Sequence, residues 1–193
     1  MCAAIGAPDR PQALVVDDSQ VDRFVLKRLL EHQGFLVVVA GDGQKAVKYY
    51  MEHADSITCI WMDINMPIQD GLQATLQIRR IERGRLRRQA SRASFVKDLV
   101  LVGEGRQVSL SQRHCTCPSQ MPVPIVGVSA CGKSEQLGNA FSSGLLHDIT
   151  DRPWKNFGMD LLVEKPMTAS KLKGILEQLD GRTPSIASAS WYP

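Results

Sequence analysis

The amino-acid sequence predicts an α/β protein built on an open, doubly wound parallel sheet with helices on both faces. Short, uninterrupted apolar runs recur along the chain and stop abruptly at polar residues, as fully buried parallel strands do. Stretches with apolar residues at helical spacing separate these runs. With 193 residues, 44% of them apolar, the chain is long enough for one domain with a substantial core.

The first strand-and-helix unit is expected at the N-terminal end. The apolar run at residues 13–16 stops at Asp17 and Asp18. Ser19 then has the spacing of a capping box for a helix that Gly34 ends. Two acids at the end of a strand are costly unless a positive charge lies beside them.

A second strand is expected at residues 35–40, followed by a turn at residues 41–43 and a second helix. The apolar face of that helix would consist of Ala46, Val47, Tyr50 and Met51. A third helix is expected to begin at Asp70 and to lose its periodicity at Ile81.

The third strand draws attention because its apolar run ends in an acid, Asp63, with turn residues directly after it. Asp63 is not needed as a helix cap, since Asp70 and Gly71 occupy a better capping position. The carboxylate of Asp63 is therefore a candidate for chemistry.

Residues 83–122 interrupt the alternation and are interpreted as an insertion, which opens with an arginine-rich run. A solvated helix extension is the preferred interpretation of the run, over contact with an acidic partner or nucleic acid and over kinase sites at Ser91 and Ser94. Residues 99–110 are compatible with a small hairpin. The run consists of Arg79, Arg80, Arg83, Arg85, Arg87, Arg88 and Arg92, against Glu82.

The alternation resumes with a fourth strand at residues 123–128, which ends at Ser129. Residues 131–157 have weak helical periodicity and suggest a second insertion, at about 133–156. A last strand at residues 159–163 precedes Lys165, and Thr168 caps a final amphipathic helix. Residues 1–11 and 181–193 are expected to be flexible tails around a domain at 12–180.

The polar residues at the strand ends predict a common site, because the carboxyl ends of parallel strands gather at one edge of the sheet. Three converging carboxylates, Asp17, Asp18 and Asp63, suit a hard divalent cation, and Mg²⁺ is the natural candidate. A carboxylate can also attack phosphorus to give an aspartyl phosphate. Lys165 would supply positive charge to the phosphoryl oxygens and Ser129 a hydroxyl donor.

Five motifs in this order resemble a response regulator receiver domain, over residues 12–82, 123–132 and 157–180. The motifs are Val15-Val16-Asp17-Asp18-Ser19, Met62-Asp63-Ile64-Asn65-Met66-Pro67, Asp70-Gly71, Pro124-Ile125-Val126-Gly127-Val128-Ser129-Ala130, and Gly158-Met159-Asp160 with Lys165-Pro166. The resemblance implies a flavodoxin-like (βα)₅ fold with strand order 2-1-3-4-5. Within this family the chain is similar to the chemotaxis proteins. The receiver is expected to stand alone, since no output domain follows Leu179.

The resemblance also implies roles for individual residues in a two-component phosphorelay. Asp63 matches the phosphoacceptor, Asp17 and Asp18 the acids that bind Mg²⁺, and Ser129 and Lys165 the catalytic hydroxyl and lysine. The backbone carbonyl of Asn65 would be a further metal ligand. The phosphoryl group would come from a sensor histidine kinase or a histidine phosphotransfer protein, with a downstream protein partner that the sequence does not identify.

Two other classes of function stay open on the sequence. A pseudo-receiver would bind proteins without phosphorylation, which the intact Asp63, Ser129 and Lys165 argue against. A hydrolase with an aspartyl nucleophile is disfavoured because Asn65 stands where a second acid would be needed. One departure from the receiver pattern is Leu162, which occupies the position of the family's switch aromatic. A receiver is not expected to be an enzyme in the classical sense.

The composition indicates which classes of partner and which cellular compartment to expect. A net charge of +3 is mild and argues against nucleic acid as a partner. The chain has five cysteines, an odd number, and their spacing is irregular, which indicates reduced thiols rather than disulfides. The chain has no run approaching the ~18 apolar residues of a membrane span, and no secretory leader. A cytoplasmic or nuclear protein that does not contact membranes is expected.

Overall fold

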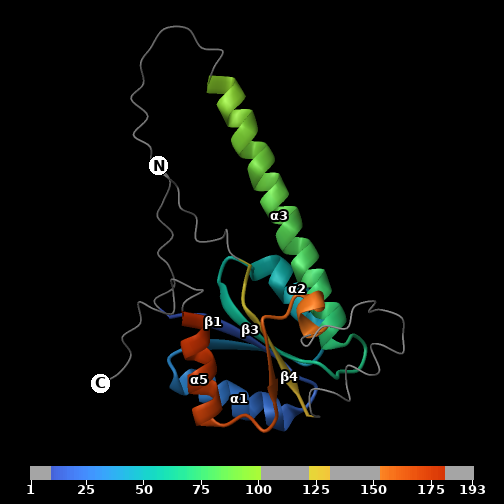
Figure 1. The fold of residues 1–193 in the computed structure, drawn as a ribbon, viewed down its shortest axis with the longest axis vertical. Coiled ribbons are helices and arrows are strands. Elements are labelled where there is room, and N and C mark those ends of the chain that lie inside the picture. Colours follow the sequence, from blue (N-terminus) through green and yellow to red (C-terminus); the bar gives the residue numbers. More distant parts are fainter. Residues whose placement is uncertain (1–9, 101–121, 131–152, 181–193) are drawn as a thin grey trace.

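The computed structural model describes residues 10–100, 122–130 and 153–180. A five-stranded parallel sheet in the order β2-β1-β3-β4-β5 forms its centre (Figure 1). The predicted fold class and strand order are confirmed. The elements are β1 (Gln12–Val16), α1 (Gln20–His32), β2 (Leu36–Ala40), α2 (Gly43–His53), β3 (Ile57–Asp63), α3 (Gly71–Val100), β4 (Ile125–Ser129), the 3₁₀ turn η2 (Pro153–Phe157), β5 (Leu161–Glu164) and α5 (Ala169–Asp180).

The sheet separates two hydrophobic cores, one on each face. In β1, Leu14 and Val16 belong to the core beneath α2 and α3, whereas Ala13 and Val15 belong to the core beneath α1 and α5. The central strands β1 and β3 are buried on both faces. Burial on both faces explains why these strands are continuous apolar runs rather than alternating patterns.

The helix boundaries follow from local side-chain chemistry. Ser19, Asp42, Asp70 and Thr168 each accept a hydrogen bond from the backbone amide three residues later, at 2.7–3.3 Å. These bonds satisfy amides that the first turn of a helix leaves without partners. Gly34 follows α1 with a φ of 85°, a conformation that glycine adopts without strain. The predicted caps Ser19, Asp70 and Thr168 and the predicted end of α1 are confirmed, and Asp42 is an additional cap.

Helix α3 is the main departure from the predicted elements. The apolar periodicity stops at Ile81 as described, but the helix does not: α3 continues to Val100 and extends well beyond the sheet (Figure 1). The arginine-rich run is thus a helix extension, which was the preferred interpretation. The prediction of a hairpin strand that begins at Leu99 is wrong, since Leu99 and Val100 end this helix. The rest of the predicted hairpin lies outside the described residues.

Smaller differences concern α2 and the second insertion. Met51 was expected on the apolar face of α2, but its side chain is 61% exposed. Of the segment 131–157 only η2 is described, as a 3₁₀ turn. Of the predicted tails, 1–11 and 181–193, all but residues 10 and 11 lie outside the described part of the chain. Within the parts that the structure describes, no helix combines the length and apolar character that crossing a membrane requires.

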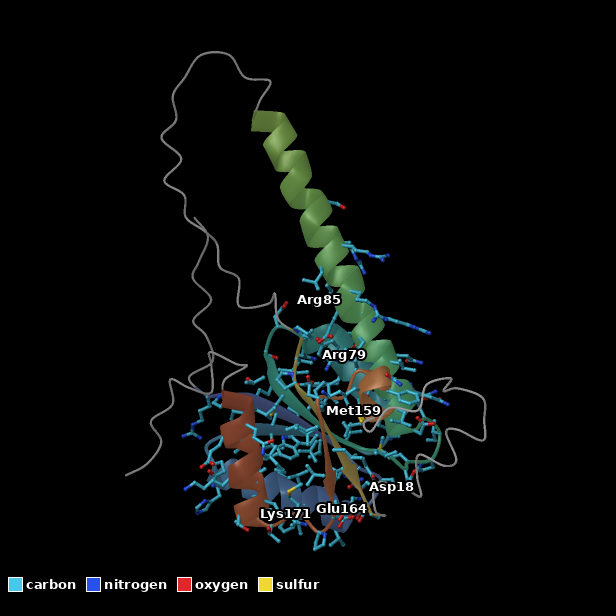
Figure 2. All side chains as sticks on the ribbon, in the orientation of Figure 1. Asp18, Arg79, Arg85, Met159, Glu164 and Lys171 are labelled. Atoms are coloured by element: carbon cyan, nitrogen blue, oxygen red, sulfur yellow. The ribbon has the colours of Figure 1, made fainter. Side chains whose placement is uncertain are left out.

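Arg79 on α3 fixes the segments that lead into β4 and β5 (Figure 2). Its guanidinium donates hydrogen bonds to the carbonyls of Val123, at 2.8 Å, and Gly158, at 2.9 Å. It also forms ion pairs with Glu82, at 2.8 Å, and Asp160, at 3.0 Å. Because Val123 precedes β4 and Asp160 precedes β5, this buried network sets where both strands enter the sheet.

Candidate functional site

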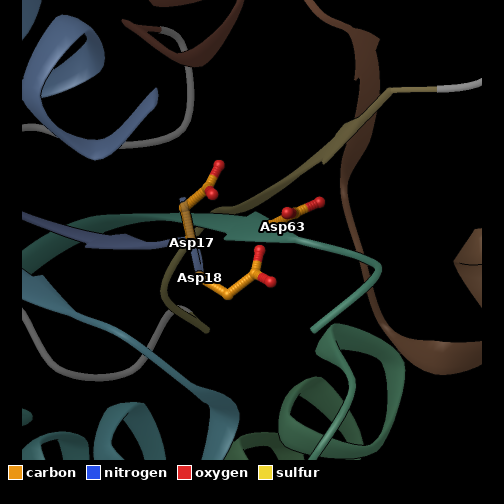
Figure 3. A group of neighbouring side chains, drawn as sticks. All are labelled: Asp17, Asp18 and Asp63. Atoms are coloured by element: carbon orange, nitrogen blue, oxygen red, sulfur yellow. The ribbon is translucent and has the colours of Figure 1, made fainter. Parts of the chain in front are cut away.

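Three carboxylates meet at the carboxyl end of the sheet (Figure 3). Strands β1 and β3 are neighbours, with Val16 opposite Met62, so the next residues along the chain, Asp17 after β1 and Asp63 at the end of β3, come side by side. One carboxylate oxygen from each of Asp17, Asp18 and Asp63 lies within 4.8 Å of the others. Asp17 and Asp63 are buried and Asp18 is exposed. We call these three residues the acidic cluster.

Lys165 supplies the positive charge that the acidic cluster needs. Its ammonium lies 2.7 Å from the carboxylate of Asp17 and 3.0 Å from that of Asp63. A third carboxylate, that of Asp22 on α1, lies 3.0 Å away. An ammonium has three N–H donors, so these three contacts can occupy all of them.

Burial and ion pairing shift the pKa values of Asp63 and Lys165 in opposite directions. Burial raises the pKa of Asp63 above its usual range, although the hydrogen bond from Lys165 works in the other direction. For Lys165, burial by itself would lower the pKa, but the hydrogen bonds to Asp17, Asp22 and Asp63 outweigh it and the pKa is raised. Lys165 therefore stays protonated at neutral pH.

The loop after Asp63 is wrapped tightly against it. The amide of Gly71 donates to the carbonyl of Ile64 at 2.9 Å, and a Cβ at position 71 would lie 2.0 Å from the carbonyl oxygen of Asp63. Only glycine fits such an approach. The amide of Asn65 lies 3.4 Å from a carboxylate oxygen of Asp63, so the start of this loop also faces the acid.

Ser129 lies at the end of β4, the strand next to β3. Val128 pairs with Asp63 in the parallel register, so Ser129 stands one residue beyond the level of that acid. Ser129 is buried, and its carbonyl accepts a 2.7 Å hydrogen bond from the amide of Lys165. The neighbouring Ala130 is exposed. Strands β3, β4 and the end of β5 thus bring Asp63, Ser129 and Lys165 to one edge.

Sequence reasoning did not identify Asp22, whose carboxylate contacts Lys165. It also missed Arg23, whose guanidinium donates to the backbone carbonyl of Asp17. Asp22 and Lys165 are 143 positions apart, so no local pattern relates them. The one available signal was that Asp22 and Arg23 lie in the first turns of a helix that starts beside the acidic cluster.

The acidic cluster fits a hard divalent cation. All three donors are carboxylate oxygens, which Mg²⁺ prefers, and two are already buried. Octahedral Mg²⁺ holds its ligands at about 2.0–2.1 Å, so opposite ligands lie roughly 4.2 Å apart. A spread of 4.8 Å needs only a small adjustment to reach that geometry. Such an acidic site is typical of the Mg²⁺ site of receivers.

Comparison with protein families also identifies a receiver domain. Residues 13–87 match the family model described as the response regulator receiver domain. The chain contains a response regulator receiver domain. Receivers of this kind take part in two-component signal transduction and are not classical enzymes.

Curated relatives include chemotaxis proteins and histidine kinases. Over 73 residues, 38% of this chain, the receiver is 38% identical to chemotaxis protein CheY of Halobacterium salinarum and covers 59% of that protein. Over 169 residues, 88% of this chain, it is 25% identical to Histidine kinase 5 of Arabidopsis thaliana, of which it covers 16%. The chain spans less than two thirds of the length of the first curated relatives it matches.

Solved structures share the receiver fold. One is the receiver domain of a sensor histidine kinase from Pseudomonas aeruginosa with a magnesium ion coordinated in its active site cleft (TM-score 0.56, 22% identity, 89% of this chain and 98% of that chain). Another is the complex of the Saccharomyces cerevisiae histidine phosphotransfer protein Ypd1 with the receiver domain of Ssk1 (TM-score 0.55, 20% identity, 94% of each chain).

Proposed function

We propose that this receiver accepts a phosphoryl group on Asp63 in a phosphorelay and changes its binding to a partner protein as a result. The observation that carries the proposal is the position of the Lys165 ammonium, 3.0 Å from the buried carboxylate of Asp63. A buried carboxylate beside a fixed cation and two further acids has no evident structural purpose. The receiver domain is taken as residues 12–180, with insertions at about 83–122 and 133–156.

In the proposed reaction a carboxylate oxygen of Asp63 attacks the phosphorus of a phosphohistidine. The new O–P bond forms as the N–P bond breaks, and the released imidazole takes up a proton. Lys165 donates N–H groups to the phosphoryl oxygens, and the hydroxyl of Ser129 donates another hydrogen bond. Catalysis of such a transfer is mainly positioning and neutralisation of charge.

Mg²⁺ is the proposed cofactor. Asp17, Asp18, Asp63 and the backbone carbonyl of Asn65 would hold it, leaving other positions to water and a phosphoryl oxygen. Bound Mg²⁺ would neutralise charge on the phosphoryl group. The related Pseudomonas receiver, which carries magnesium in its cleft, supports this choice.

The proposed phosphoryl donor is a sensor histidine kinase or a histidine phosphotransfer protein. An exposed apolar patch on α1, formed by Val21, Phe24 and Val25, supports docking of such a protein beside the site. Asp22, in the same turn as Val21, contacts Lys165, so the patch borders the reactive groups. The Ypd1 complex supports this class of partner by analogy. A cytoplasmic or nuclear location stays a prediction.

Incubation with acetyl phosphate and Mg²⁺, followed by intact mass measurement, tests the function. We expect a phosphoryl adduct that EDTA prevents and that Asp63→Asn abolishes. Absence of an adduct would favour a pseudo-receiver that binds proteins without phosphorylation. Rapid release of phosphate with no lasting adduct would favour an aspartyl hydrolase, which Asn65, two residues after Asp63, argues against.

A further inference from the structure

Asp22 differs from the other two carboxylates that contact Lys165. Asp17 and Asp63 belong to the acidic cluster, whereas Asp22 does not. Its carboxylate comes from the first turn of α1, where its own amide is fixed by Ser19 at 3.3 Å. Asp22 is therefore a counter-ion of Lys165 that does not also serve the proposed cation site.

The three contacts of Lys165 create a competition. Because an ammonium has three N–H donors, a phosphoryl oxygen on Asp63 gains a hydrogen bond from Lys165 only if a present partner gives one up. Asp17 and Asp63 would direct their charge to a cation in the acidic cluster. Asp22 has no such alternative and continues to attract the lysine.

We propose that Asp22 is a positioning residue that shares Lys165 with the phosphoryl group and so weakens the hold of the lysine on that group. The inference rests on the proposed function and concerns how firmly the phosphorylated state is stabilised. The negative charge of Asp22 also repels an anion bound at Asp63, in the same direction. Both effects disfavour the phosphorylated state and favour the cation-bound, unphosphorylated one.

The size of the effect follows from exposure. The side chain of Asp22 is 46% exposed, against 6% for Asp17 and 6% for Asp63, so solvent screens its ion pair with Lys165. Exposed ion pairs change equilibria by a factor of roughly two to five. Asp22 is thus suited to adjusting the stability of the phosphorylated state rather than to switching it on or off.

Asp22→Asn tests the proposal, since the amide keeps the shape and one oxygen acceptor but loses the charge. Beryllofluoride, a phosphoryl analogue, is titrated at saturating Mg²⁺ and followed by fluorine NMR, and Mg²⁺ itself is titrated by calorimetry. We expect beryllofluoride to bind about two- to fivefold more tightly in the variant. Mg²⁺ is expected to bind equally well or more weakly. A merely structural role would weaken both ligands together.

Two further variants make the test specific. Glu177→Gln removes an exposed acid from α5 and should leave both affinities unchanged, which controls for net charge. In a Lys165→Ala background, Asp22→Asn should lose most of its effect on beryllofluoride and keep only the part due to direct charge repulsion, because the residue acts mainly through the lysine. Beryllofluoride affinity that is unchanged or lower in Asp22→Asn, or a gain of full size without Lys165, would overturn the inference alone. Wild-type protein that binds no beryllofluoride would overturn the proposed function with it.

Discussion

Arg79 on α3 and Asp160 before β5 form a 3.0 Å ion pair although they are 81 positions apart in the sequence. The same carboxylate oxygen of Asp160 accepts a 2.8 Å hydrogen bond from the amide of Ile125 at the start of β4. One guanidinium and one carboxylate thus connect α3, β4 and β5. The strands that carry Ser129 and lead to Lys165 are held in place from the opposite end of the sheet.

Arg79→Ala should therefore destabilise the fold strongly. The side chain of Arg79 is only 11% exposed, and its loss leaves Glu82 and Asp160 without their buried counter-ion. We expect the free energy of unfolding to fall by about 3–5 kcal/mol, measured by urea denaturation. Arg80→Ala, at the exposed neighbouring position, is the control and should change it by less than about 0.5 kcal/mol. Equal effects of the two variants would contradict this role.

Gly71→Ala should disturb the site through the loop after Asp63. The added Cβ would lie 2.0 Å from the carbonyl oxygen of Asp63, so the backbone must move. We expect a loss of about 1–3 kcal/mol in stability and slower phosphorylation by acetyl phosphate. The matched control is Gly174→Ala in α5, where nothing lies within 4 Å of the added Cβ.

The Gly174→Ala control should stabilise the protein by about 0.5–1 kcal/mol, because alanine loses less backbone freedom than glycine in a helix. A Gly71→Ala variant that is as stable and as reactive as wild type would show that the loop tolerates the shift.

Asp63→Asn should stabilise the protein in EDTA, and increasingly so as the pH rises. Burial raises the pKa of Asp63 in the folded state above its ordinary value of 3.8. A raised carboxyl pKa favours folding below the unfolded-state pKa, and this contribution disappears as the pH rises through the folded-state pKa. The melting-temperature difference between variant and wild type should therefore grow from about pH 4 toward neutrality and then level off.

Each 1 kcal/mol of that difference corresponds to about 2–4 °C in a chain of this length. Saturating Mg²⁺ should reverse the order by stabilising wild type alone. A difference that shrinks as the pH rises would mean that Lys165 more than compensates for the burial of Asp63.

The extension of α3 should become more helical as salt is added. Arg83 and Arg87 are four residues apart on one face of the helix, and like charges at this spacing oppose helix formation by about 0.2–0.5 kcal/mol per pair. Salt screens this repulsion. We expect far-ultraviolet circular dichroism to report more helix at about 0.5 M than at about 0.02 M sodium chloride.

Replacing Arg83 and Arg87 with glutamine should reduce that salt response. A response of the same size in the double variant would place its origin outside the arginine run.

The strands and caps were predictable because their signals are local. A buried strand such as β3 is an apolar run of the right length, and Ser19 or Asp70 caps a helix through an amide three residues away. The meeting of Asp17 with Asp63 also followed, since parallel strands place their carboxyl ends at one edge. These features depend on residues close in sequence or on a single rule of topology.

The extension of α3 and the role of Asp22 were not predictable in the same way. Beyond Ile81 the helix has few apolar residues at regular spacing, so hydrophobic periodicity, the main signal for a helix, is absent even though arginine is a good helix former. Asp22 has a local explanation as part of the α1 N-terminus, and that explanation concealed a contact with Lys165 made only in the folded chain. The prediction that Met51 is buried on the apolar face of α2 was wrong because helical spacing does not specify where the core ends.

The most direct test of the central claim is to locate the phosphoryl group. The protein is incubated with a phosphorylated histidine phosphotransfer protein and Mg²⁺, reduced with borohydride to convert an aspartyl phosphate to homoserine, digested and analysed by peptide mass spectrometry. We predict homoserine at position 63 and nowhere else among the acids of the site, with no conversion when EDTA is present. Conversion at Asp17, Asp18 or Asp22 instead, or transfer that persists in Asp63→Asn, would contradict the assignment of Asp63 as the phosphoacceptor.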